Sequence, residues 1–289
     1  MAQPLYLLAP TPDRIAEVER SLALPAGMLQ HALDQNELPR LEKDGTSTLV
    51  ILRVPVVNTR PDEPPFGTVA VGLLFKEDAQ VLVCRQVLPI VEALQRHAPA
   101  GPERAGHLLL RLVMASAEAF LTHLGTLTKE VDALEDRVGR ALGNQEVLGL
   151  LRQQKSLVFF ITALKENEIL MERLRREPLL DVDAGDHDLL EDALVELRQA
   201  LEVTRINSDI LSSTMDAFAS IISNNLNVVM KFLTAVTIVI SIPTLVASLY
   251  GMNVPLPGAG TPGAFVVVSA VSLAVAGAVA LLFWKKGWL

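Results

Sequence analysis

Two apolar segments without a charged residue lie near the C-terminus of this chain, at residues 232–250 and 264–284. They contain 19 and 21 residues, and a helix needs roughly 20 apolar residues to cross the hydrocarbon core of a bilayer. Both segments are therefore predicted to be transmembrane helices, and no earlier segment is expected to qualify. A buried helical hairpin in a soluble protein is the alternative, which the length and the absence of charge disfavour.

The charges around these segments predict their orientation. Lys231 precedes the first segment, Lys285 and Lys286 follow the second, and the connection at 251–263 carries no charge. Because basic flanks stay on the cytoplasmic side, both termini are predicted to be cytoplasmic. The chain is thus expected to be a multi-pass protein of the cytoplasmic (inner) membrane, embedded in the lipid bilayer. Two aromatic residues lie where interfacial anchors are common, namely Trp284 and Trp288.

Composition excludes several classes of function. The net charge of −8 argues against a nucleic-acid partner, because phosphate binding needs clustered Lys and Arg. The single cysteine, Cys84, excludes an intrachain disulfide and fits a reducing compartment. The N-terminus lacks the basic and apolar regions of a signal peptide. Phosphate-loop and zinc-helix motifs are absent, so neither an enzyme nor an organic cofactor is expected.

Residues 1–100 are predicted to form a cytoplasmic α/β domain. Strands are expected at residues 48–54, where Pro55 would end the strand, and at 68–75 and 79–84. The last two should form a hairpin around residues 76–78. Short helices are predicted at 15–24 and from Val87 towards the Pro-Gly break near residue 100.

Long helices are predicted for residues 101–226. Apolar residues recur at alternating spacings of three and four between Leu110 and Val138, which is typical of a long helix packed against others. Gly143-Asn144 should end it, and a second helix should span 145–176. The third begins near Asp186 and meets no Pro or Gly before Pro243, so it is expected to run from the cytoplasm into the membrane and transmit movement.

A polar stripe marks the segment at 227–250. Its members are separated by seven, three, four, three and four residues, which places them on one helix face: Asn227, Thr234, Thr237, Ser241, Thr244 and Ser248. Close helix packing is one explanation, because small hydroxyl residues favour it in membranes. A water-facing pore wall is the other, and it requires an oligomer, since two helices cannot enclose a pore.

The absence of Asp, Glu and Arg in both segments limits the chemistry of such a pore. A carboxylate proton relay has no candidate residues. Mg²⁺ prefers oxygen ligands and holds its water tightly, and hydroxyls and carboxamides can hydrogen-bond that water without stripping it. The membrane potential can drive inward movement, so no ATP site is needed.

Four sequence motifs carry a family resemblance. Tyr-Gly-Met-Asn at 250–253 ends the first apolar segment, and Lys-Lys-Gly-Trp-Leu occupies 285–289. With residues 227–234 and 34–42, these motifs resemble the CorA family of divalent cation transporters, over nearly the whole chain. A Gly-Met-Asn tripeptide alone is a weak signal, but its position between two terminal apolar segments makes it specific.

The resemblance implies an α+β fold: an α/β/α cytoplasmic funnel, a long stalk helix and two C-terminal transmembrane helices in a homopentameric channel. The implied divisions are 1–100, 101–226, a pore helix at 227–250, an external loop at 251–263, and a second transmembrane helix with a basic tail at 264–289. The implied activity is movement of hydrated Mg²⁺, or Co²⁺, down its electrochemical gradient, gated by cytoplasmic Mg²⁺.

The resemblance also implies roles for individual residues. Gly251, Met252 and Asn253 would form the outer selectivity filter, with the Asn253 carboxamide contacting the hydrated ion and Tyr250 bracing the ring. Further pore-lining positions would be Thr244 and Ser241, an apolar constriction at Met230 and Leu233, and a polar ring at Asn227, beside Thr234, Thr237 and Ser248 of the stripe.

Regulatory Mg²⁺ would bind between neighbouring cytoplasmic domains through an acidic residue early in the stalk helix, which by position is Asp192. Asp188 is a second candidate, within an acidic run that also contains Asp181, Asp183, Asp186 and Glu191. Carboxylates suit a hard cation, but acidic residues are also common at helix starts. Possible partners in the first domain are Glu77, Asp78 and Glu92.

Two departures and two alternatives complete the prediction. The loop at 254–263 lacks the acidic residues of many relatives, and Pro243 is displaced by one position from the expected proline. Transport of Zn²⁺ or another divalent metal is one alternative, which the retained Met252 modestly disfavours. A membrane-tethered scaffold is the other, although a tether needs neither the stripe nor Asn253.

Overall fold

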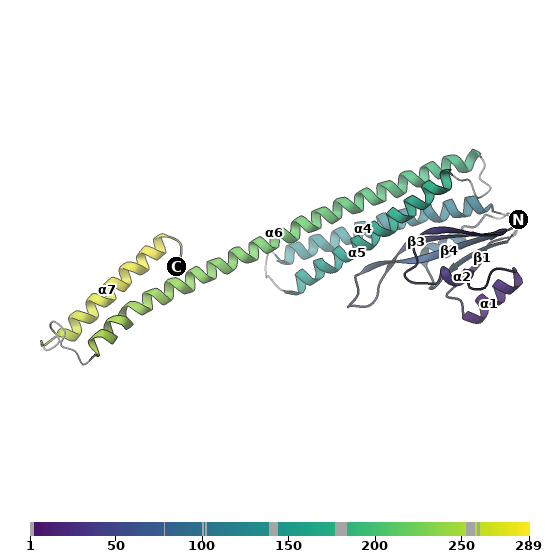
Figure 1. Cartoon of the computed structure of the whole chain (residues 1–289). Coiled ribbons are helices and arrows are strands. Elements are labelled where there is room, and N and C mark those ends of the chain that lie inside the picture. Colours follow the sequence, from purple (N-terminus) through teal and green to yellow (C-terminus); the bar gives the residue numbers. More distant parts are fainter. Residues whose placement is uncertain are drawn as a thin grey trace. The chain divides into compact units, whose positions relative to one another are not determined.

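The structure is a computed structural model that describes residues 3–77, 79–99, 101, 103–138, 144–176, 184–252, 258 and 261–289. The chain divides into two compact units, Met1–Met215 and Asp216–Leu289. The first holds a sheet with helices on both faces, and the second holds the apolar C-terminal helices (Figure 1).

A five-stranded sheet in the order β1-β5-β4-β3-β2 forms the centre of the first unit. All neighbouring strands are antiparallel except β1 and β5, which are parallel. The strands predicted at 48–54, 68–75 and 79–84 are confirmed, as is their hairpin, since Lys76 pairs with Ala79. The strands are β1 (Leu5–Leu8), β2 (Arg40–Asp44), β3 (Ser47–Val57), β4 (Phe66–Lys76) and β5 (Ala79–Cys84).

Pro55 does not end its strand, contrary to the sequence prediction. β3 continues to Val57, and Pro55 pairs with Thr68 of β4. The backbone N–H of Arg53 points away from β4, to the other edge of β3, where it donates to the side chain of Asn167 from a helix. Because backbone groups alternate along a strand, the missing N–H of Pro55 faces that same edge. β2 pairs with β3 only as far as Ile51, so Pro55 removes no ladder bond.

Helices cover both faces of the sheet and make a three-layer α/β/α arrangement (Figure 1). On one face, α1 (Pro12–Ser21) and α2 (Met28–His31) close a buried cluster that includes Ile15, Leu29 and Leu49. The helix predicted at 15–24 therefore begins and ends three residues earlier. On the other face lie α4 (Ala105–Val138) and α5 (Asn144–Arg176).

Gly72 of β4 allows α2 to approach the sheet, and its replacement by Ala should destabilise the fold. A Cβ atom at Gly72 would lie 2.4 Å from Cβ of the buried Ala32, well inside van der Waals contact. We expect Gly72→Ala to cost about 1–3 kcal/mol by overpacking, measured by thermal unfolding. Gly125→Ala is the matched control, because a Cβ there meets nothing within 4 Å and α4 should gain up to about 1 kcal/mol. Equal stability of the two variants would contradict this packing.

The remaining helices follow the predicted order with shifted ends. α3 (Pro89–Arg96) begins two residues after the predicted Val87, with Pro89 in its first turn. Asn144, predicted as part of a break, opens α5, whereas Gly143 lies outside the described residues. α6 (Ala184–Tyr250) has 67 residues and continues through Pro243. The last helix is α7 (Ala264–Lys285).

The prediction that only two segments could cross a membrane is wrong when helices are judged by length and composition alone. Among the described residues, four helices qualify: α4, α5, α6 and α7. Burial separates them, since 50% and 39% of the apolar windows of α4 and α5 are buried against the first unit, compared with 6% and 11% for α6 and α7. The apolar faces of α4 and α5 are thus used to cover the sheet.

Candidate functional site

The C-terminal part of α6 carries every residue of the predicted pore wall. These residues lie on one uninterrupted helix, and the spacings of the polar ones place them on one face. All are exposed in the single chain: Asn227, Met230, Leu233, Thr234, Thr237, Ser241, Thr244 and Ser248. The structure therefore leaves this face available to water, lipid or another copy of the chain.

Three hydroxyl groups of this face donate to the backbone of their own helix. Thr237 donates to the carbonyl of Leu233 at 2.8 Å, Ser241 to that of Thr237 at 2.7 Å, and Thr244 to that of Ile240 at 2.9 Å. A hydroxyl has one proton and two lone pairs. With the proton committed to the helix, each oxygen offers only acceptor capacity to its surroundings.

The helix ends in a tight turn at the predicted filter. The N–H of Gly251 donates to the carbonyl of Ala247 at 2.9 Å, and the N–H of Met252 donates to that of Leu249 at 3.4 Å. Tyr250 and Met252 are exposed. Asn253, the residue assigned to the ion contact, lies outside the described residues, so its role stays a prediction.

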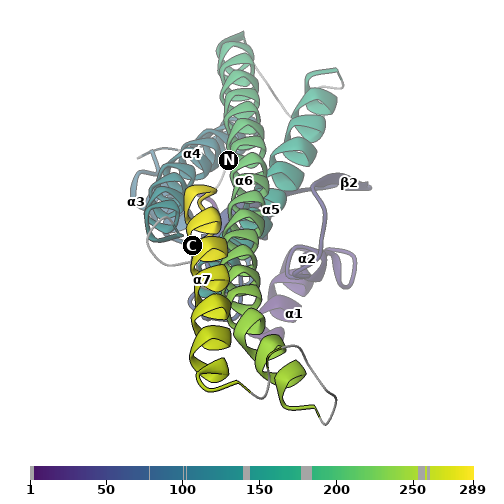
Figure 2. The same cartoon turned by 90° about the vertical axis from the view of Figure 1, so that its left-hand side faces the viewer.

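A cavity of about 550 Å³ lies between α6 and α7. The two helices run side by side in the second unit (Figures 1 and 2). Tyr250 and Gly251 line the cavity together with Phe265 and Ser269 of α7. Tyr250 thus lies between the turn at Gly251 and Met252 and the second helix, although its bracing role stays a prediction.

The C-terminal end of α7 is closed by a compact turn. Gly287 has a φ of +68°, a left-handed conformation that glycine adopts without strain. Its N–H donates to the carbonyl of Trp284 at 3.0 Å, and that of Trp288 donates to Phe283 at 2.9 Å. The Trp288 ring stacks on Phe283 with centroids 5.3 Å apart. This is a Schellman motif with its usual hydrophobic contact.

The acidic start of α6 separates into buried and exposed groups. Asp186 is buried and contacts Arg104 and His107, each at 3.4 Å. Glu191 contacts Arg175 at 3.3 Å, so it too is engaged in an ion pair.

Asp188 and Asp192 are exposed and lie one helical turn apart. Within the described ranges, no three His, Cys, Asp or Glu side chains come together as a metal site. Glu77 and Glu92 are exposed, and the structure does not bring them to Asp192 as a metal group. The remaining acidic candidates lie outside the described residues: Asp78, Asp181 and Asp183.

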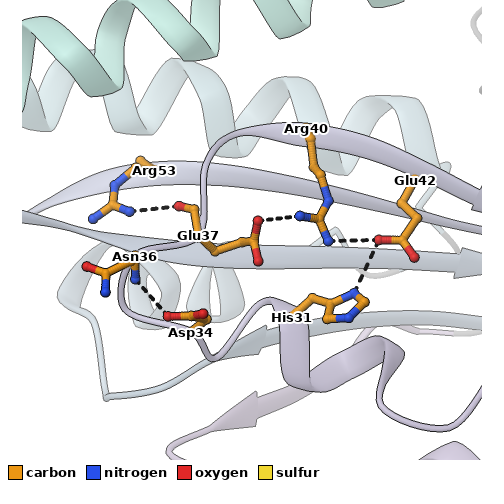
Figure 3. Close-up of polar contacts among 7 residues, drawn as sticks. All are labelled: His31, Asp34, Asn36, Glu37, Arg40, Glu42 and Arg53. Carbon is orange, nitrogen blue, oxygen red and sulfur yellow. Dashed lines mark hydrogen bonds and ion pairs between the residues drawn. The ribbon is translucent and has the colours of Figure 1, made fainter.

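The family-like segment at 34–42 has a structural use in this chain. Arg40 contacts Glu37 and donates to Glu42 at 2.9 Å, and His31 contacts Glu42 at 3.2 Å (Figure 3). Burial raises the pKa of Glu42, but the hydrogen bond from Arg40 and the interaction with His31 outweigh it and lower the pKa. Arg53 donates to the carbonyl of Glu37 at 2.7 Å. These contacts fix the turn that leads into β2.

The first unit has an α/β/α arrangement, and the 67-residue α6 and the apolar α7 are long and apolar enough to cross a membrane. These features define a class, that of membrane proteins. The family comparison makes this specific. Residues 5–286 match the model of the CorA-like Mg²⁺ transporter protein, and the chain belongs to that family.

Individual relatives agree with this assignment. The cobalt/magnesium transport protein CorA of Methanocaldococcus jannaschii is 24% identical over 287 residues, which cover 97% of this chain and 89% of that protein. The solved structure of the CorA magnesium transporter from that organism matches with a TM-score of 0.85 at 23% identity, over 99% of this chain and 90% of that one. The full-length CmaX protein matches with a TM-score of 0.73 at 22% identity, over 99% and 88%. At these identities the structural matches establish the fold alone.

Proposed function

We propose that this chain forms a channel for hydrated Mg²⁺, with Co²⁺ as a second cargo, and that five copies surround one pore. The observation that carries the proposal is the α6 face on which three hydroxyls have committed their protons to the backbone. Family membership supports Mg²⁺ as the cargo, and the related protein of Methanocaldococcus jannaschii is named for cobalt and magnesium transport.

The acceptors at these three positions of the wall fit a hydrated cation. Water molecules bound to Mg²⁺ turn their oxygens to the metal and their protons outwards, so the shell needs acceptors around it. The oxygens of Thr237, Ser241 and Thr244 supply acceptors at successive levels of α6. Because Mg²⁺ gives up its water reluctantly, accepting hydrogen bonds from the shell is less costly than replacing it.

The remaining pore residues have separate proposed roles at the two ends of the pore. Asn253 would offer carboxamide oxygens at the outer end, and Met230 with Leu233 would form an apolar constriction at the inner end, where an uncharged gate can close by excluding water. The membrane potential contributes roughly 2.3 kcal/mol per charge per 100 mV, so about twice that for a divalent ion. This drives inward movement without ATP.

The proposed topology has two transmembrane helices, the C-terminal part of α6 and α7, with both termini in the cytoplasm. The burial of α4 and α5 against the sheet supports this number. The basic residues that flank α6 and α7 support the orientation. The uncharged loop at 251–263 would then lie on the outer face.

Cytoplasmic Mg²⁺ is proposed to inhibit the channel through Asp188 and Asp192. Both carboxylates are exposed on one face of α6, where an ion shared with a neighbouring copy would relieve their mutual repulsion. An ion that binds the closed state better shifts the population towards it. Loss of internal Mg²⁺ should therefore favour opening.

Asp188→Asn with Asp192→Asn is expected to weaken this inhibition. We expect the internal Mg²⁺ concentration for half-inhibition of uptake to rise at least about tenfold, equivalent to roughly 1.4 kcal/mol of lost binding. Asp209→Asn is the matched control, since Asp209 is an exposed carboxylate on the same helix. Unchanged inhibition in the double variant would exclude these residues as the sensor.

The test of the proposed function is Mg²⁺ uptake by the purified full-length protein in proteoliposomes. Uptake should appear without ATP, increase when the interior is made negative, and fall when internal Mg²⁺ is raised. Parallel assays with Co²⁺ and Zn²⁺ establish the cargo. Absence of flux for every divalent ion at both potentials would favour the membrane-tethered scaffold instead.

A further inference from the structure

We propose that the C-terminal end of α7, together with the facing part of α6, binds the headgroups of anionic phospholipids. The proposed site, called here the basic-aromatic patch, consists of Lys231, Lys285, Lys286, Trp284 and Trp288. The proposal rests on the membrane topology given above, and nothing in the ion pathway requires it.

The three lysines lie at about the same height along the helix pair. Lys231 lies 19 residues before Tyr250, and Lys285 lies 21 residues after Ala264, which at 1.5 Å per residue is about 29 Å and about 32 Å from the connecting loop. α7 runs back beside α6 (Figures 1 and 2), so both counts end at the same level. This is the depth at which a bilayer of roughly 30 Å meets its headgroups.

These lysines lie in a stretch of the sequence that has no acidic side chain. Residues 217–289 contain no Asp or Glu, and the three lysines are the whole of their side-chain charge. All three are exposed. A cationic group at a membrane surface attracts anionic lipid, and the phosphate oxygens of a headgroup can accept from an ammonium group.

Lys285 and Lys286 could instead interact with the C-terminal end of α7 itself, since cations favour helix C-termini. The Schellman turn makes this interaction less necessary. Three carbonyls of the last turn, those of Leu282, Phe283 and Trp284, already accept backbone N–H groups at 3.1, 2.9 and 3.0 Å. The ammonium groups are therefore free to serve an external anion.

The aromatic residues fix the depth of the patch. Trp284 is 68% exposed, and Trp288 is held on Phe283 by the turn. Tryptophan prefers the interface between acyl chains and headgroups. The two indoles would thus hold the adjacent lysines at the level of the lipid phosphates.

The test uses intrinsic fluorescence, because Trp284 and Trp288 are the only two tryptophans of the chain. The full-length protein is placed in nanodiscs made of equal fractions of phosphatidylcholine and phosphatidylglycerol. In one sample the phosphatidylcholine carries bromine, and in the other the phosphatidylglycerol does. We expect brominated phosphatidylglycerol to quench the tryptophan fluorescence about fivefold more effectively per molecule than brominated phosphatidylcholine. This ratio is the preference for anionic lipid that roughly one lysine near the membrane surface would give.

Variants then assign the preference to the lysines. It should fall to about one in Lys231→Gln/Lys285→Gln/Lys286→Gln. It should persist in Lys43→Gln/Lys129→Gln/Lys165→Gln, which removes three exposed lysines from the first unit. The wild-type comparison of the two brominated lipids needs no variant, so it holds even if the triple variant fails to fold.

The other outcomes separate this proposal from the proposed function. Equal quenching by both lipids, or an undiminished preference in the patch variant, overturns the lipid site and leaves the channel untouched. Quenching by neither lipid overturns the lipid site and the two-helix topology together. Loss of Mg²⁺ flux with intact lipid preference argues against the channel alone.

Discussion

Asn253→Ala is expected to reduce Mg²⁺ uptake into proteoliposomes by about 100-fold. A hydrogen bond to a charged group is worth roughly 1.5–3 kcal/mol, which corresponds to about 10-fold to 150-fold in affinity. In the proposed oligomer the carboxamide is lost from every copy at once. The charge-free character of residues 251–263 leaves no acidic group in the loop to compensate.

Two further variants sharpen this test. Asn253→Gln keeps the carboxamide and should retain part of the uptake. Thr261→Ala is the matched control in the same loop, because the Thr261 hydroxyl donates to the carbonyl of Gly258 at 2.8 Å and has no assigned ion contact. Wild-type uptake by Asn253→Ala would remove the filter assignment.

The second large effect concerns the edge of the sheet, where Asn167→Leu should destabilise the first unit by about 2–5 kcal/mol. The buried carboxamide of Asn167 accepts from the N–H of Arg53 at 3.0 Å and donates to the carbonyl of Arg53 at 2.7 Å. It therefore serves the strand edge that β2 leaves open. A buried polar group without a partner costs roughly 1–3 kcal/mol, and two groups lose theirs together.

Thermal unfolding of the full-length protein in detergent measures this effect. Asn167→Asp should be damaging as well, because a carboxylate can accept from the N–H of Arg53 but cannot donate to its carbonyl. Thr162→Val, at an exposed position of the same helix, should change stability by less than about 0.5 kcal/mol. A transition temperature for Asn167→Leu equal to that of Thr162→Val would contradict the proposed edge contact.

The central strands could be predicted from sequence, and the outer ones could not. β3, β4 and β5 are continuous runs of β-branched and apolar residues, the pattern of strands buried on both faces. β2 has the sequence Arg-Leu-Glu-Lys-Asp and becomes a strand only because β3 offers it partners. β1 has four residues and pairs in parallel with a strand more than 70 positions away, which local periodicity cannot indicate.

The candidate site divides in a similar way. Helical spacing predicts that the polar stripe lies on one face of α6, because this periodicity is local and does not depend on tertiary contacts. The direction of the hydroxyl protons depends on side-chain rotamers and was not predicted. In the sequence the acidic run before Asp192 forms one cluster, but in the structure Asp186 is buried against Arg104 and His107. This pairing depends on how α4 packs beside α6, which the sequence does not indicate.

The committed hydroxyl protons of Thr237, Ser241 and Thr244 have a consequence for ions of the opposite sign. Chloride and phosphate are held in proteins by hydrogen-bond donors, and these three side chains have none left to offer. At these three levels the proposed pore would offer an anion no side-chain donor, although its wall contains no negative charge. In the proposed channel, the polarity of these hydrogen bonds would contribute to discrimination between charge signs, and this contribution would persist at salt concentrations that screen charged rings.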